Sequence, residues 1–216
     1  MDSPLIFEPF AHVYTTRDGR RVPSVTQILR VCGQSTDFEG LSDTSDWRRK
    51  KIDHRRDLGS AVHADTHAWD DNDLDTKSVH PDVLPFLGCW SLFRLRKRLT
   101  PVLRERILFH HGLWYCGTTD GLFRTPDFDG LIMPDLKIGN PEDAAAQFQT
   151  AGYELAYRLE HPDAPPIQRW SVQLTPGEPE PYRITVYDDY NDLAYWSRVI
   201  VPNFYNPRRR RTYGFA

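Results

Sequence analysis

The sequence between residues 113 and 138 reads LWYCGTTDGLFRTPDFDGLIMPDLKI, and it decides the expected fold. Two strand-like runs, Leu113–Arg124 and Leu131–Ile138, flank a segment of proline, aspartate and glycine that favours a turn. A third run, Val102–Phe109, precedes them and is separated from them by His-His-Gly. Because each run has the length of a strand and each break favours a turn, this stretch predicts a three-strand meander.

The residues before the meander predict one hairpin and three helices. Phe7–Val22 alternates around Asp18-Gly19, as a β-hairpin does. Ser24 can cap a short helix that ends near Gly33, and a loop is expected from there to Thr44. The last two helices are expected at Ser45–Trp69, with a break near Gly59, and at Pro81–Leu99, with a regular part from Pro85 because proline is tolerated in a first turn.

Helices and strands also alternate after the meander. Asn140-Pro141-Glu142-Asp143 combines a cap, a first-turn proline and first-turn acids, and predicts a helix to about Leu159. Strands are expected at Ile167–Leu174 and Tyr182–Tyr187, and a final helix at Asn191–Asn203. This order predicts an α/β fold with a mixed central β-sheet flanked by helices. We expect one domain over residues 1–216, with an N-terminal part (1–100), a sheet core (101–188) and a C-terminal helix with a basic tail (189–216).

Composition excludes several classes of protein. The chain has 216 residues, a formal net charge of −3 and three scattered cysteines, Cys32, Cys89 and Cys116. This spacing fits neither a disulfide framework nor a paired cysteine metal site, so reduced thiols are expected. The sequence has neither the pattern of a secretory signal nor an apolar run of membrane-spanning length. We therefore expect a cytoplasmic protein that does not bind membranes.

The meander also carries the residues that point to chemistry. Asp135 and Lys137 lie two apart on one strand and therefore share a face. Asp120 lies on the neighbouring strand, so its carboxylate is expected to converge on the same place. Two carboxylates beside an ammonium suit a Mg²⁺ or Mn²⁺ ion and a lysine that steadies a water or a phosphate. A surface salt bridge is the alternative.

Four further residues can be placed around these three. Gln149 and Tyr153 are spaced i and i+4, which puts them on one face of the next helix. His63, on the helix upstream, could add an imidazole ligand, which makes an oxygen site more hospitable to Mn²⁺. Glu105 could orient ligands or water, or it could form a cross-strand ion pair with a flanking arginine.

Taken in order, His63, Glu105, Gly117-x-x-Asp120, Asp135-x-Lys137 and Gln149-x-x-x-Tyr153 resemble the RecB-type branch of the PD-(D/E)XK nuclease superfamily, which includes lambda exonuclease. The resemblance spans roughly residues 59 to 157. It implies that His63, Asp120 and Asp135 bind the metal, that Lys137 acts at the attacking water, and that Gln149 and Tyr153 contact the nucleic-acid backbone or support the site. Some relatives hold an iron-sulfur cluster on four cysteines, and we expect none here because the cysteines are too few.

The expected function is that of a metal-dependent deoxyribonuclease, more specifically an exonuclease in phage or mobile-element recombination or DNA processing. DNA is the expected partner, and a homo-oligomer or a recombination protein is a further candidate. The basic runs Trp47–Arg56, Arg94–Arg98 and Arg208–Arg211 could help to bind DNA or could be solvated surface. Two alternatives are a catalytically silent nucleic-acid-binding module of the same fold and a zinc hydrolase built on His63 and His67.

Overall fold

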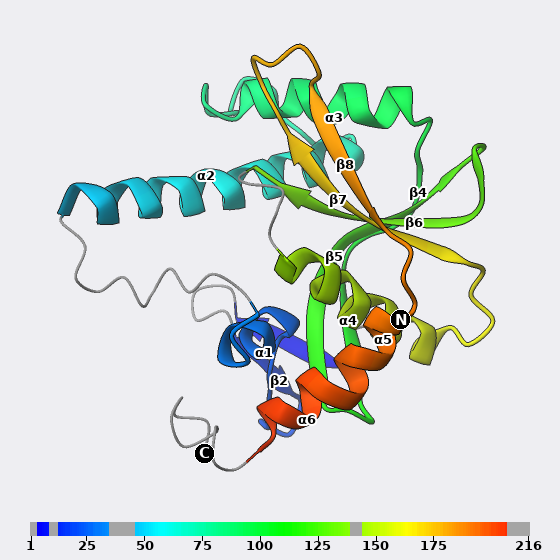
Figure 1. The fold of residues 1–216 in the computed structure, drawn as a ribbon. Helices are drawn as coiled ribbons and strands as arrows, with labels where there is room; N and C mark the ends of the chain where they lie inside the picture. The colour runs from blue at the N-terminus through cyan, green and yellow to red at the C-terminus, as the bar shows by residue number, and fades with distance from the viewer. Residues whose placement is uncertain (1–3, 9–12, 35–45, 139–143, 207–216) are drawn as a thin grey trace.

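The core of the protein is a five-stranded sheet in the order β4-β5-β6-β7-β8 (Figure 1). The computed structural model describes residues 4–8, 13–34, 46–138 and 144–206. The strands are β4 Thr100–His110, β5 Tyr115–Thr125, β6 Phe128–Lys137, β7 Ile167–Leu174 and β8 Tyr182–Tyr187. Strands β6 and β7 are parallel, and each other neighbouring pair is antiparallel. The α/β class with a mixed sheet is therefore confirmed, as is the predicted meander.

The parallel pair explains the helix between β6 and β7. The chain between two parallel strands must return to the end of the sheet at which the first strand began, and a helix usually makes that crossover. Here it is α4, Ala144–Glu160. The predicted start of this helix at residues 140–143 lies outside the described residues, but its end agrees with the prediction.

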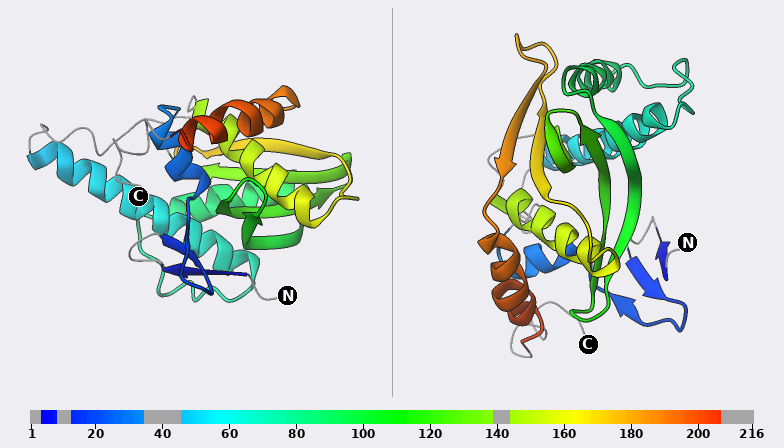
Figure 2. Two further views of the ribbon diagram at one scale, coloured as in Figure 1. Left: turned by 90° about the horizontal axis from the view of Figure 1, so that it is seen from below. Right: turned by 90° about the vertical axis from the view of Figure 1, so that its right-hand side faces the viewer.

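Helices cover both faces of the sheet (Figure 2). Alternate residues of β6 show the division, because Leu131 and Met133 pack with α4 while Ile132 and Leu136 pack with the helices of the opposite face. On the α4 side lie α1 (Val25–Val31) and a C-terminal helix. On the other side lie α2 (Asp46–Asp70) and α3 (Leu84–Arg96).

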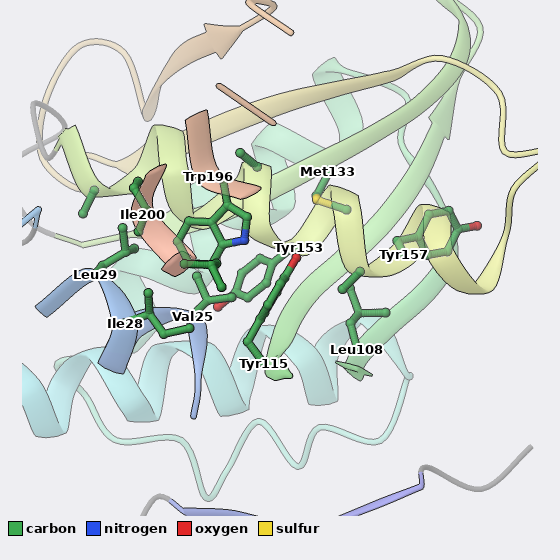
Figure 3. Packing of buried hydrophobic residues seen from close by; sticks show 14 of the residues in the cluster. Val25, Ile28, Leu29, Leu108, Tyr115, Met133, Tyr153, Tyr157, Trp196 and Ile200 are labelled. Carbon is green, nitrogen blue, oxygen red and sulfur yellow. The ribbon is translucent and has the colours of Figure 1, made fainter. Parts of the chain in front are cut away.

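Trp196, Val25 and Tyr115 belong to the core on the α4 side (Figure 3). Their packing depends on a close approach at Gly152. A Cβ atom at this position would lie 2.9 Å from the Trp196 ring and 3.0 Å from Val25. The Gly152 carbonyl also accepts a hydrogen bond of 2.8 Å from the Tyr115 hydroxyl. The absence of a side chain therefore lets α1 and the C-terminal helix pack directly on α4.

The predicted C-terminal helix is present, but it is not uniform. It consists of α5 (Asn191–Tyr195), one π-helical turn (Trp196–Ile200) and α6 (Val201–Phe204). Pro202 has no N–H to donate to the preceding turn, and the helix widens there. The basic tail that follows, Arg208–Arg211, lies outside the described residues.

Two N-terminal predictions need correction. The predicted two-strand hairpin is a three-stranded sheet of β1 (Leu5–Glu8), β2 (Val13–Thr16) and β3 (Arg21–Val22). Its β2–β3 turn does contain Gly19, at φ +82°. The predicted break near Gly59 is wrong, because α2 is continuous through that residue, where the helix lies alongside Ile138.

Other predictions are confirmed, or concern residues outside the described part of the chain. The short helix begins with the Ser24 capping box, and α3 has a proline in its first turn. Residues 35–45 of the expected loop are not among the described ones. Cys32, Cys89 and Cys116 are buried free thiols. In the part of the chain that the structure describes, none of the helices combines the length and the apolar composition needed to cross a membrane.

Buried ion pairs join α4 to β7 and to the C-terminal helix. The fully buried Glu154 carboxylate lies 2.8 Å from Arg158 Nε and 3.3 Å from Arg169 Nε. Arg169, whose side chain is 2% exposed, also lies 2.8 Å from Asp192 on α5. Since a charge at this depth is costly without a partner, these acids hold three elements in one arrangement.

We expect Glu154→Ala to lower the free energy of unfolding by roughly 3 kcal/mol, because it leaves Arg169 buried with one acid fewer. Glu178→Ala is the control, since Glu178 pairs with Arg183 on the surface and should matter by less than about 1 kcal/mol. Urea unfolding of both variants measures the difference. Equal effects would contradict the role given to the buried network.

Candidate active site

The site lies where the β5–β6 pairing ends. These strands pair at Phe123 with Ile132 and at Thr125 with Phe128, and the backbone ladder goes no further. Asp120 and Asp135 follow directly beyond that point, one on each strand. The Leu136 N–H donates a 2.7 Å hydrogen bond to Asp120 Oδ2. A side chain thus takes the place of the missing ladder bond and fixes the Asp120 carboxylate between the two strands.

Lys137 links this pair of acids to α4. Its Nζ lies 2.8 Å from Asp135 Oδ2 and donates to Gln149 Oε1 at 3.2 Å. Gln149 Nε2 in turn donates to the Tyr153 hydroxyl at 3.1 Å. The two pairs that were expected to share a face, Asp135 with Lys137 and Gln149 with Tyr153, are thereby joined in one chain of contacts.

Gly117 lets the Tyr153 ring approach β5. A Cβ atom at Gly117 would lie 2.5 Å from Tyr153 Cε1, closer than real side-chain contacts allow. The glycine of the Gly117-x-x-Asp120 motif therefore has a steric role in this fold, because any side chain there would displace the tyrosine from the site.

His63 reaches the site from α2. Its Nδ1 lies 3.2 Å from Asp120 Oδ1. Burial alone would lower the pKa of His63, but the Asp120 carboxylate outweighs it and raises that pKa above 6.5. Burial works against ionised Asp120 too, yet His63, the Leu136 N–H and Lys137 together hold the pKa of Asp120 below its ordinary value. The two side chains form a charged pair.

The pKa of the second carboxylate, Asp135, is shifted in the opposite direction to that of Asp120. Burial is the main cause that raises the pKa of Asp135, and nearby Asp120 adds to it, although Lys137 acts against both. The pKa of Tyr153 lies well above its usual value through burial and through the charge of Asp135. Two carboxylates with pKa values pushed apart are typical of sites that handle protons or cations.

Glu105 has an unusual backbone conformation. Its φ is +39°, in the left-handed region, and it falls between the paired residues Arg104 and Arg106 of β4. Its Oε2 lies 3.2 Å from His67 Nδ1. The predicted alternative of an ion pair with a flanking arginine is wrong, because Arg104 pairs with Asp71 and Arg106 with Glu160.

A small cavity beside His63, Glu105 and Asp120 is relevant to metal binding. Its volume is about 20 Å³, room for roughly one water-sized guest. Its lining includes two imidazoles and three carboxylates, from His63, His67, Asp70, Glu105 and Asp120. Asp135 Oδ2 is buried and receives no aligned hydrogen bond despite its ion pair with Lys137. The carboxylates and imidazoles of this lining are a donor set that suits a divalent cation such as Mn²⁺.

The side chains that the structure describes are not arranged as a closed set of ligands around such an ion. Among the described residues, no three His, Cys, Asp or Glu side chains are grouped closely enough to hold a metal. His63 and His67, the predicted zinc pair, contact different carboxylates, those of Asp120 and Glu105. Binding of a cation at His63, Asp120 and Asp135 would therefore require these side chains to move.

The basic run Arg94–Arg98 at the end of α3 is only partly exposed and is largely paired with acids. Arg94 is 9% exposed, pairs with Asp70, and donates to the Leu99 carbonyl at 3.0 Å. Arg96 and Arg98 are exposed and pair with Glu180 and Asp127. In the other basic run, most side chains from Trp47 to Arg56 lie outside the described part of the chain.

Comparisons with known proteins leave the family open. No family model matches the chain, and no curated protein matches it. A solved structure that is similar to it comes from Eubacterium rectale and carries the provisional description of an exonuclease. The identity is 13%, the match covers 75% of this chain and 68% of that one, and the TM-score is 0.46. At that distance, function has to be inferred from the site itself.

Sequence reasoning missed the contribution of the N-terminal sheet. The Tyr14 hydroxyl on β2 lies 2.9 Å from Thr118 Oγ1, within the Gly117-x-x-Asp120 motif. Cys116 N–H also donates to the Pro23 carbonyl, so β5 continues into contact with the chain entering α1. Neither contact has a local signal in the sequence, because the partners are about a hundred residues apart.

We expect His63→Gln to change the pH dependence of stability. A raised His63 pKa means that the charged pair stabilises the fold below about pH 6.5 and that this contribution is lost as the pH rises through the folded-state pKa. The variant should be less stable by up to about 1 kcal/mol at low pH and nearly equal to the wild type at pH 9. Urea unfolding across this range measures it, with exposed His111→Gln as the control. A constant difference at all pH values would contradict the pairing.

Glu105→Gly should relieve the backbone at this position. An L-residue in the left-handed region costs about 1 kcal/mol or more, and glycine does not have this cost. We therefore expect Glu105→Gly to be more stable than Glu105→Gln, which removes the charge but keeps the backbone cost. The comparison is made by chemical unfolding, and a glycine variant less stable than the glutamine variant would refute it.

Proposed function

We propose that the protein is a metal-dependent nuclease that hydrolyses phosphodiester bonds in DNA, with a PD-(D/E)XK core of the RecB type. One observation carries the proposal: Asp120 and Asp135 meet where β5 and β6 part, with Lys137 2.8 Å from one and His63 3.2 Å from the other. Two carboxylates, a lysine and an imidazole at one point match the chemistry of cation-assisted attack on a phosphate.

The metal proposed is Mg²⁺ or Mn²⁺, held by His63, Asp120 and Asp135. Such an ion, when bound, activates a water and neutralises charge on the phosphate. The two carboxylates and the imidazole at one place support this assignment, and His63, which is protonated in its pair with Asp120, would release that proton on binding the ion. No iron-sulfur cluster is part of the proposal.

The chain's own residues position the reactants. Lys137 carries a positive charge beside Asp135, where it can hold a phosphate oxygen or steer a water toward phosphorus. Gln149 fixes the lysine through its side-chain oxygen. Tyr153 accepts a hydrogen bond from Gln149, and its high pKa keeps the phenol protonated, so that its own proton is available to a phosphate oxygen.

The finer parts of the proposal come from the family resemblance. The first is exonuclease action on linear DNA in phage or mobile-element recombination or DNA processing. The second is a cytoplasmic protein that acts alone, as a homo-oligomer or together with a recombination protein. A silent DNA-binding module is the outcome of the test if binding occurs without cleavage. No contact among the described residues favours the zinc hydrolase.

We expect linear DNA to be degraded in the presence of Mg²⁺ or Mn²⁺ and to stay intact in EDTA. Lys137→Ala should reduce the rate at least about 100-fold, because it removes the cation that faces the phosphate. Lys77→Ala, at an exposed turn position, is the control for loss of a lysine. End-labelled single- and double-stranded substrates and closed circles measure polarity and the need for an end.

Two results would count against the proposal. Metal-dependent cleavage that persists in both Lys137→Ala and Asp120→Asn would show that the activity arises elsewhere. DNA binding without cleavage under any metal would leave the silent module as the better description.

A further inference from the structure

A second, larger pocket has Tyr153 and Glu105 in its lining. Its volume is about 490 Å³, within the range of small-ligand pockets. Its walls come from the N-terminal sheet and from β4 and β5, with lining residues that include Phe7, Tyr14, Ile107, Thr118 and Tyr153. The N-terminal sheet therefore builds one side of a cleft that adjoins the candidate active site.

The pocket offers an aromatic surface. Phe7 on β1 stacks on Tyr14 of β2 with ring centroids 4.5 Å apart and planes at 26°. Tyr14 is buried and its hydroxyl is hydrogen-bonded to that of Thr118, whereas Phe7 is only half-buried. Phe7 is thus the ring that a flat ligand in the pocket could reach.

The charges of the pocket disfavour a phosphate. Among the described residues that line it, Glu105 is the only charged side chain, and neither lysine nor arginine is present. The hydroxyl groups of Thr26 and Thr118 stand at its wall and can bond to donors or acceptors. A planar, neutral group with a hydrogen-bonding edge fits this lining, and a nucleobase is such a group.

Two residues link the pocket to the candidate active site. Tyr153 lines the pocket and also belongs to the chain of contacts that ends at Asp135. Glu105 lines both this pocket and the small cavity beside Asp120. A nucleotide whose phosphate lies at the acids would therefore have the pocket within reach of its base or of the adjoining one.

We propose that this pocket receives an unpaired nucleobase of the DNA strand, stacked on Phe7, next to the phosphate at Asp120 and Asp135. The inference rests on the proposed nuclease function and adds a substrate class to it. A base in a duplex is paired and stacked on its neighbours, so it has to leave the helix to enter a pocket. The enzyme is thereby fitted to single-stranded DNA or to an end that has frayed.

The test uses a single-stranded oligonucleotide that contains 2-aminopurine, whose fluorescence falls when it stacks on an aromatic ring. The titration is done in EDTA with the full chain, and cleavage of unlabelled DNA with Mg²⁺ is followed separately. Phe7→Leu keeps an apolar side chain but removes the ring. Ile6→Ala is the matched control, because Ile6 is its neighbour on β1, is 58% exposed and points to the other face.

We expect quenching by the wild type and by Ile6→Ala, and at least about five-fold weaker binding by Phe7→Leu, since stacking of one base contributes about 1 kcal/mol or more. Thr26→Leu, at an exposed position that narrows the pocket, should also weaken binding. Thermal unfolding of each variant identifies any loss of fold, and Thr26→Leu then decides the matter if Phe7→Leu is unfolded.

The two readouts separate this inference from the proposed function. Cleavage by the wild type with equal quenching by all variants, or with no quenching, overturns the pocket assignment and leaves the nuclease intact. Quenching that depends on Phe7 and Thr26 without any cleavage supports the pocket and counts against the nuclease. Tighter binding of duplex than of single strands would also overturn the inference.

Discussion

The site is built around one constraint, which is that two buried carboxylates, those of Asp120 and Asp135, are held near each other. Asp120 and Asp135 repel when both are ionised, and burial adds to the cost for each. The fold compensates from several directions, with His63 on α2, the Leu136 N–H on β6, and Lys137 beside Asp135. Since these groups come from different elements, the acids acquire their electrostatic state only when the helix and both strands are in place.

Several arginines hold the fold together. Arg94, Arg158 and Arg169 are paired with acids in or near the core, and Arg104 fastens β4 to the end of α2 through Asp71. These four arginines are therefore occupied within the fold, whereas others, such as Arg124 and Arg198, are exposed.

The sequence was informative where a signal is local. The spacing of Asp135 and Lys137 on a strand, and of Gln149 and Tyr153 on a helix, predicted which side chains share a face, and both pairs do. It failed where the outcome depends on distant partners. Arg94 looked like a surface cation because its partner Asp70 lies on another helix. The conformation of Glu105 has no local signal at all, since nothing in Arg-Glu-Arg indicates a positive φ.

The packing at Gly152 has a consequence for the order in which the molecule is made. The helix that carries Gln149 and Tyr153 is covered by Trp196, which is fully buried against it, and this residue is synthesised long after the acids of the meander. A growing chain on the ribosome therefore has its acids and lysine well before it has the support that sets their helix in position. The arrangement of the site is therefore completed only after Trp196 has been added to the chain.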